Sequence, residues 1–243
     1  MSLQHFTTAT AIPAAVADGT NKASRGDAFG AQHVRNEVLA WAEEGSYFRA
    51  TNATMGTGIA MGIQTSFSAT ANVLFAMRNG SSTKKVIPHY IRLVCTVAGA
   101  STTASNLAVV MDTATRYSSG GTDLSARVVN ANSGLAPNTV VDQLFFGALT
   151  CSAASAARTV GRCILRTQTA PCWAVGDEVR INFDPSGDID APVITGAGPL
   201  VIPRNFGPVV LGGQNHTLLL HMWNTANAST APSWEVEAAW WER

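Results

Sequence analysis

Charge is scarce in this sequence. Asp, Glu, Lys and Arg make up 13% of its 243 residues, about half the ~25% that is usual for soluble domains. Sixteen basic residues balance sixteen acidic ones, so the formal net charge is zero. A neutral chain has no long-range field that attracts nucleic acid or an anionic membrane, and we expect neither as a partner. A charge-poor surface also disperses poorly in water, which is typical of chains whose surface is covered by partners in an assembly.

Long apolar runs and known catalytic motifs are absent as well. No run approaches the ~18 apolar residues that a membrane-spanning helix needs. The first residues lack the basic start and the apolar stretch of a secretory signal, so we expect a soluble chain made in a reducing compartment. HExxH, GxSxG, the Walker loop and the kinase motifs do not occur. We therefore predict no enzyme activity and no cofactor.

Cysteine is rare, and its spacing suggests no metal site. The four cysteines form neither a CxxC pair nor a zinc spacing, and two of them lie in strand-like runs. We interpret those two, Cys95 and Cys163, as buried thiols, while a bridge between Cys163 and Cys172 across a hairpin stays open. The four are Cys95, Cys151, Cys163 and Cys172.

Histidines and aspartates give only weak indications of a metal. His216 and His221 lie five apart on one predicted strand and point to opposite faces, so they cannot share an ion. His89 and His221 would approach each other only if their strands pair. Residues 184–190 hold three aspartates in a loop, which suits Ca²⁺, but the EF-hand spacing and its closing Glu are missing. We prefer a solvated turn and predict no metal.

The sequence does contain clear strand patterns, which centre on residues 86–113. In the first run of this stretch every second residue falls on one face, a period of two that predicts a half-buried strand. The second run, residues 107–111, is apolar on both faces and predicts a central strand. Small polar residues join the two runs and predict antiparallel neighbours. The face of the first run that we expect in the core comprises Ile87, His89, Ile91, Leu93, Cys95 and Val97.

Similar patterns recur along the chain and define the fold class. They predict an all-β fold, a two-sheet antiparallel β-sandwich that is jelly-roll-like. Residues 114–138 and 184–208 are rich in turn residues and predict long loops. The further strands are predicted at residues 57–65, 72–79, 126–130, 140–150, 159–168, 178–183, 209–211, 216–224 and 233–242.

The first 45 residues differ from the rest. Residues 1–32 are rich in Ala, Thr, Gly and Ser without a period and predict an extended arm. Residues 33–45 predict one short helix with Val34, Val38 and Trp41 on one face and Gly45 as its end. A single short helix is unstable alone in water, so this face must dock on the sandwich or on another subunit. The sandwich domain is predicted at residues 46–243.

The last strand carries three tryptophans. Its alternation places Trp234 and Trp240 on one face and Trp241 beside Glu235 and Glu237 on the other. Such a strand is either an anchor within the sheet or a subunit contact. Together with the helix face, the candidate partner contacts are Val34, Val38, Trp41, Trp240 and Trp241.

Four segments resemble virion structural proteins of tailed bacteriophages. They read AEEGSYFRATNATMGTGIA, YIRLVCTVAGAS, DTATRYSSGGTDLS and WEVEAAWWER, and the similarity runs from about residue 41 to residue 243. The resemblance implies a jelly-roll-like sandwich that assembles, often as a homotrimer, on the outside of the capsid. Capsid cement or decoration proteins fit best, and tail, baseplate or head-fibre proteins are the near alternative. No catalytic residue can be transferred.

The resemblance also implies partners and a location. The partners would be copies of the chain itself and the major capsid protein or other virion proteins. The chain would be made in the host cytoplasm and would end on the virion surface. The rival hypothesis is a carbohydrate- or receptor-binding sandwich, with an aromatic platform formed by Trp223, Trp234, Trp240 or Trp241. The same tryptophans can instead pack in the core or at a subunit interface.

Overall fold

A computed structural model describes residues 37–52, 54–99, 104–154, 156–167, 173–183, 200–224 and 230–243. Residues 42–243 form one compact unit, in which two largely antiparallel sheets pack face to face. This confirms the predicted two-sheet β-sandwich. The predicted arm at residues 1–32 lies outside the described residues. No helix in the described part of the chain is long and apolar enough to cross a membrane.

The first sheet, sheet I, contains both the first and the last strand of the chain. Its order is β11-β10-β4-β13-β1-β7, with the short β2 also paired to β13. The β10–β11 pair is parallel, and the other pairs are antiparallel. The strands are β1 (Tyr47–Thr51), β2 (Ile59–Ala60), β4 (Val86–Val97), β7 (Val128–Asn130), β10 (Glu178–Asn182), β11 (Val201–Asn205) and β13 (Ser233–Glu242).

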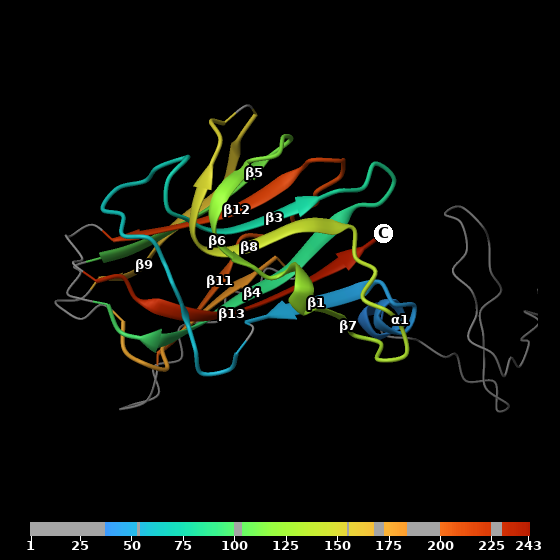
Figure 1. Ribbon diagram of the computed structural model, residues 1–243, viewed down its shortest axis with the longest axis horizontal. Helices are drawn as coiled ribbons and strands as arrows, with labels where there is room; N and C mark the ends of the chain where they lie inside the picture. Colours follow the sequence, from blue (N-terminus) through green and yellow to red (C-terminus); the bar gives the residue numbers. More distant parts are fainter. Residues whose placement is uncertain are drawn as a thin grey trace, which may run out of the picture. The chain divides into compact units, whose positions relative to one another are not determined.

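The second sheet, sheet II, has the order β6-β8-β3-β12-β5-β9. In Figure 1 its strands form one layer and those of sheet I form the other. The chain passes from one sheet to the other at most connections, as jelly-roll folds do. The strands are β3 (Val73–Asn79), β5 (Ala104–Asp112), β6 (Tyr117–Asp123), β8 (Val141–Cys151), β9 (Arg158–Thr167) and β12 (Thr217–Asn224).

The core lies between the inner faces of the two sheets. β13 contributes the face that its alternation predicts, because Trp234, Val236, Ala238 and Trp240 are all buried there. β10 does the same with Val179 and Ile181. The C-terminal strand is therefore an interior strand of sheet I, between β4 and β1.

The predicted helix is present as α1 (Glu37–Glu43), and residues 33–36 lie outside the described part. It ends as predicted. Gly45 has φ 78°, a left-handed conformation that glycine adopts at low cost, and its N–H donates to the Ala42 carbonyl at 3.1 Å. A 3₁₀ turn, η1 (Ser125–Arg127), precedes β7.

The prediction that the two runs of residues 86–113 are neighbours is wrong. β4 pairs with β10 and β13 in sheet I, while β5 pairs with β12 and β9 in sheet II. Both strands have an apolar inner face, so their patterns look alike. A short polar connection shows that the chain reverses, but it does not show whether the next strand joins the same sheet or crosses to the opposite one.

A β-bulge in β4 overturns part of its predicted core face. Tyr90 lies opposite Ala239 while Pro88 lies opposite Trp240, so His89 is an extra residue in the ladder. An extra residue reverses the alternation beyond it. Ile91, Leu93 and Cys95 face the core as predicted, but Ile87 and His89 do not, and Val86 and Pro88 are buried instead. Val97, at the end of the strand, was also predicted in the core but is 51% exposed.

Three strands, β1, β6 and β11, were not predicted from the sequence. β6 and β11 are edge strands inside the two predicted long loops. The sequence of β6, YSSGGTD, is polar and largely exposed, so it has no apolar period to detect. Conversely, the strand predicted at residues 57–65 shrinks to β2, and the strand predicted at residues 209–211 is only a bridge between Leu211 and Val86.

A buried ion pair connects three segments that lie next to interior strands of sheet II. Arg116 is 1% exposed, and its Nη1 donates to Asp112 Oδ2 at 2.9 Å. Its other nitrogens donate to the carbonyls of Ser152 and Ala69, both at 2.9 Å. Asp112 Oδ1 in turn accepts the N–H groups of Ala114 and Ala156. This network holds the ends of β5 and β8 and the segment before β3 together.

Candidate functional site

The outer face of sheet I carries a connected network of charged and aromatic side chains. Glu237 on β13 lies at its centre. Its carboxylate is 3.9 Å from Arg49 Nη1 and 3.8 Å from Arg92 Nη1, and it accepts a hydrogen bond of 2.5 Å from the Tyr90 hydroxyl. Burial and this hydrogen bond together raise the pKa of Tyr90. The tyrosine therefore stays a neutral donor to Glu237 over the whole physiological range.

A second part of the network extends to β10. Arg180 lies directly opposite Arg92 in the ladder, an arrangement that repulsion disfavours. The structure separates the two charges. Arg92 Nη2 donates to Glu178 Oε2 at 2.8 Å, while the Arg180 guanidinium lies 5.5 Å from the centre of the Tyr90 ring. The hydrogen bond to Glu178 contributes most to the raised pKa of Arg92.

Aromatic rings cover the end of this face beside the His89 bulge. The Tyr47 hydroxyl and His89 Nδ1 are hydrogen-bonded at 2.8 Å, and the His89 and Trp241 rings are 4.3 Å apart. Burial raises the pKa of Tyr47. The bulge thus turns the imidazole away from the core, where the strand pattern placed it, and toward the aromatic cluster.

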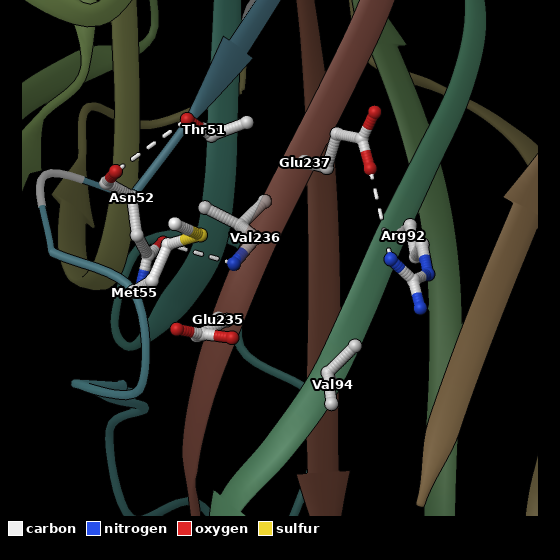
Figure 2. A pocket seen from close by; sticks show the side chains of 8 residues that line it. All are labelled: Thr51, Asn52, Met55, Arg92, Val94, Glu235, Val236 and Glu237. Atoms are coloured by element: carbon white, nitrogen blue, oxygen red, sulfur yellow. Dashed lines mark hydrogen bonds and ion pairs between the residues drawn. The ribbon is translucent and has the colours of Figure 1, made fainter. Parts of the chain in front are cut away.

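A groove lies beside the charged network, where β1 ends. Its volume is about 180 Å³, and it lies over β13 and β4. Figure 2 shows Arg92 and Glu237 pointing toward one another from neighbouring strands, with Glu235 farther along β13. The groove is lined by Thr51, Asn52, Met55, Arg92, Val94, Glu235, Val236 and Glu237.

The wall of the groove is a loop that Asn52 holds against β13. The Asn52 N–H donates to the Val236 carbonyl at 3.2 Å, and the Val236 N–H donates to Asn52 Oδ1 at 2.9 Å. The Asn52 side chain thus replaces a strand residue in the ladder, and the chain beyond it leaves the sheet. The Gly56 N–H donates to Glu235 Oε1. Met55, on this loop, is 94% exposed, the most exposed of the large apolar side chains described.

The groove is smaller than a typical small-molecule pocket, and both glutamates of β13 that line it are already hydrogen-bonded. Pockets for small ligands usually measure about 300–1,000 Å³, so a groove of about 180 Å³ suits a single inserted side chain. Glu235 and Glu237 already accept hydrogen bonds from within the chain. The formal charges of the network also cancel, since three guanidiniums and three carboxylates contribute to it. They belong to Arg49, Arg92, Arg180, Glu178, Glu235 and Glu237.

We expect Glu237→Gln to change the free energy of unfolding by less than about 1 kcal/mol, because ion pairs of partly exposed side chains contribute little. The side chains of Arg49 and Arg92 are 48% and 43% exposed. Urea denaturation of the variant and the unaltered chain measures the difference. A loss above 2 kcal/mol would show that the network holds the fold and is not merely a surface feature.

The predicted partner contacts lie in different environments. Val34 lies outside the described residues, and Val38 lies on α1 without a described side chain. Trp41 is half-buried on the same helix. Trp240 is 0% exposed and lies in the core, and Trp241 packs on Tyr47 and His89. The partner-contact role of these residues stays a prediction, but Trp240 presents no surface in this structure.

The tryptophans that were candidates for a glycan platform are all buried. Trp234 and Trp240 belong to the core, and Trp223 is covered by Phe67 and Arg162. Trp241 lies within the aromatic cluster. None of the four rings is exposed for a sugar to stack on. The alternative prediction, that these tryptophans pack against other side chains, is therefore correct.

The candidate metal and thiol residues are not brought together. His89 lies on β4 and His221 on β12, in different sheets, so their strands do not pair. Within the described residues no three His, Cys, Asp or Glu side chains cluster as metal ligands would. Cys95 is buried as predicted, whereas Cys163, for which burial was also predicted, is only half-buried. Cys151 is buried as well, and burial raises the pKa of the Cys95 and Cys151 thiols to about 11. Cys172 and the three aspartates of residues 184–190 lie outside the described residues.

The network and the groove were not predictable from the sequence. Alternation correctly placed Glu235 and Glu237 beside Trp241 on one face of β13, and it placed Arg92 opposite the core face of β4. Nothing in the sequence paired these two strands, so Arg92 and Glu237 could not be matched. No pattern in the sequence pointed to Met55 as a surface contact, because it precedes the strand predicted at residues 57–65.

Comparison with known proteins gives no relative of this chain: no family model, no curated protein and no solved structure matches it significantly.

Proposed function

We propose that the chain is a structural protein without catalytic activity that forms part of a bacteriophage virion, as a capsid cement or decoration protein. In this proposal it assembles with copies of itself, as a homotrimer, and with the major capsid protein or another virion protein. The outer face of sheet I is a contact surface in that assembly. The virion assignment rests on the sequence resemblance, and the choice of surface rests on the site.

The observation that carries the proposed surface is Met55 beside the groove. A 94% exposed methionine on a loop that the chain anchors through Asn52 is unfavourable in water, whereas a flexible thioether adapts well to a partner surface. The groove next to it accepts one side chain. The formal charges around the groove sum to zero, so covering the face buries no net charge beneath a partner. A stable interface buries about 800 Å² on each side, which requires the charged network as well as the groove.

Met55→Asp tests this surface. We expect the substitution to weaken concentration-dependent association at least about tenfold, because a carboxylate buried without a partner is costly. The melting temperature should stay unchanged, since the side chain makes little contact within the chain. Sedimentation velocity over a range of concentrations measures the association.

The matched control is Ile164→Asp. Ile164 is 58% exposed on β9, at the edge of sheet II. Its replacement by Asp therefore adds the same charge as Met55→Asp, but on the other sheet. Association that survives Met55→Asp but is lost in Ile164→Asp would move the contact surface to sheet II.

A tail, baseplate or head-fibre protein would use the same surface against a different virion partner. Isolating particles with the chain attached and mapping its neighbours by cross-linking separates these locations.

A further inference from the structure

On the outer face of sheet II a short segment covers a buried histidine. We name residues 63–72, which lead into β3, the strap. Backbone hydrogen bonds fix the strap near both of its ends. The Asn224 N–H donates to the Gln64 carbonyl at 2.9 Å, and the Cys151 N–H donates to the Thr70 carbonyl at 2.7 Å. Arg116 Nη2 adds a bond of 2.9 Å to the Ala69 carbonyl.

The middle of the strap is held by one aromatic side chain. The Phe67 ring lies 4.9 Å from the His221 ring and 5.6 Å, edge-on, from the Trp223 ring. Phe67 itself is 47% exposed with respect to the described residues, while His221 is only 2% exposed beneath it. The strap is thus a single layer over the imidazole.

The site beneath Phe67 does not favour a charged imidazole. Within the described residues neither ring nitrogen of His221 forms a hydrogen bond of normal geometry, although the Ser68 backbone lies close enough to favour the charged ring. The Nδ2 group of Asn106, on the neighbouring β5, also lacks a hydrogen-bond partner within the described residues. A buried polar group without a partner costs free energy, and a charged one costs more.

The charges around His221 are mainly positive. Arg116, from the segment after β5, disfavours a second positive charge. Arg162 on β9 lies 5.2 Å from the centre of the Trp223 ring. The carboxylate of Asp112 at the end of β5 already pairs with Arg116. A protonated His221 would therefore add a positive charge near Arg116, whose carboxylate partner is already engaged.

We propose that the strap is a pH-sensitive flap, which opens when protonation of His221 drives Phe67 off the outer face of sheet II. Burial, followed by the field of Arg116, lowers the pKa of His221 from 6.5 to about 4 when the strap is closed. With the strap open, the ring meets water and its pKa returns toward 6.5. The open state therefore binds more protons at low pH. The closed state is fully favoured above pH 6.5 and loses its advantage as the pH falls toward 4.

Opening is expected to stay local. Phe67 makes its ring contacts with His221 and Trp223 and is not part of the core between the sheets. Segments with few buried apolar contacts open at lower free energy than the strands beneath them. Release of the strap would expose Trp223 and Asn106 without separating the two sheets.

Hydrogen exchange of the full chain, read by mass spectrometry, tests the proposal. After correction for intrinsic exchange rates, protection of the strap amides should fall at least about tenfold between pH 6 and pH 4. Protection of β13, in the core of sheet I, should not change. His221→Gln, which cannot take up a proton in this range, should abolish the fall. His216→Gln, which changes the half-buried histidine just before β12, should leave it intact.

A second variant keeps the test decisive if His221→Gln does not fold. Phe67→Ala removes the half-exposed ring, so we expect opening at a higher pH and a raised His221 pKa by NMR titration. Unchanged strap protection down to pH 4 in the unaltered chain would overturn the proposal. An equal fall in His221→Gln, or an opening midpoint that Phe67→Ala leaves in place, would overturn it as well.

Discussion

Arg116→Ala is expected to lower the free energy of unfolding by about 3–5 kcal/mol. The guanidinium is fully buried, and its removal leaves the buried Asp112 carboxylate without its ion pair. The carbonyls of Ser152 and Ala69 lose their donor at the same time. The loss is a large part of the 5–15 kcal/mol that stabilises a typical domain. Urea denaturation followed by tryptophan fluorescence measures it.

The matched control is Arg92→Ala, which removes a guanidinium from the surface network. The side chain of Arg92 is 43% exposed, so water replaces the lost contacts and we expect a cost below about 1 kcal/mol. Replacing Asp112 and Arg116 together by apolar residues should cost less than Arg116→Ala alone, because no unpaired charge remains. Equal losses in Arg116→Ala and Arg92→Ala would contradict the buried network.

Trp240→Ala is expected to destabilise the chain by about 3–5 kcal/mol, the usual cost of emptying a buried aromatic position. The Trp240 ring is stacked on Phe48 with the ring centres 6.1 Å apart, and its indole N–H donates to Glu242 Oε1 at 3.1 Å. The substitution therefore leaves a cavity and removes a hydrogen bond in the middle of sheet I. Thermal and urea unfolding both report the change.

Trp240→Phe is the control, since it keeps a ring on Phe48 and fills most of the space. We expect it to lose well under half as much stability as Trp240→Ala. Comparison of the two variants also shows whether Trp240 is a core residue or a partner contact. A partner contact would give near-normal stability of the single chain and weaker association, whereas a core residue gives the opposite result.

Strand faces were predictable wherever burial differs between the two sides of a strand. β13 was predicted with its observed bounds, because Trp234 and Trp240 alternate with Glu235 and Glu237. β10 was recognised in the same way. β6 was missed, since an exposed edge strand has no apolar side to detect.

Pairing and register were not predictable. β4 and β5 carry similar patterns but belong to opposite sheets, and alternation identifies a face without identifying its neighbour. One extra residue at His89 reversed the faces at the start of β4. The contact of Arg92 with Glu237 depends on both features, because it needs the β4–β13 pairing and its register. The site therefore became visible only in the structure.

Light scattering on the unaltered protein over a range of concentrations measures whether the chain assembles into the proposed multimer. We expect a mass near three chains of 25.4 kDa each, which is about 76 kDa, maintained on dilution. A mass of 25.4 kDa at every concentration would contradict self-assembly through the outer face of sheet I.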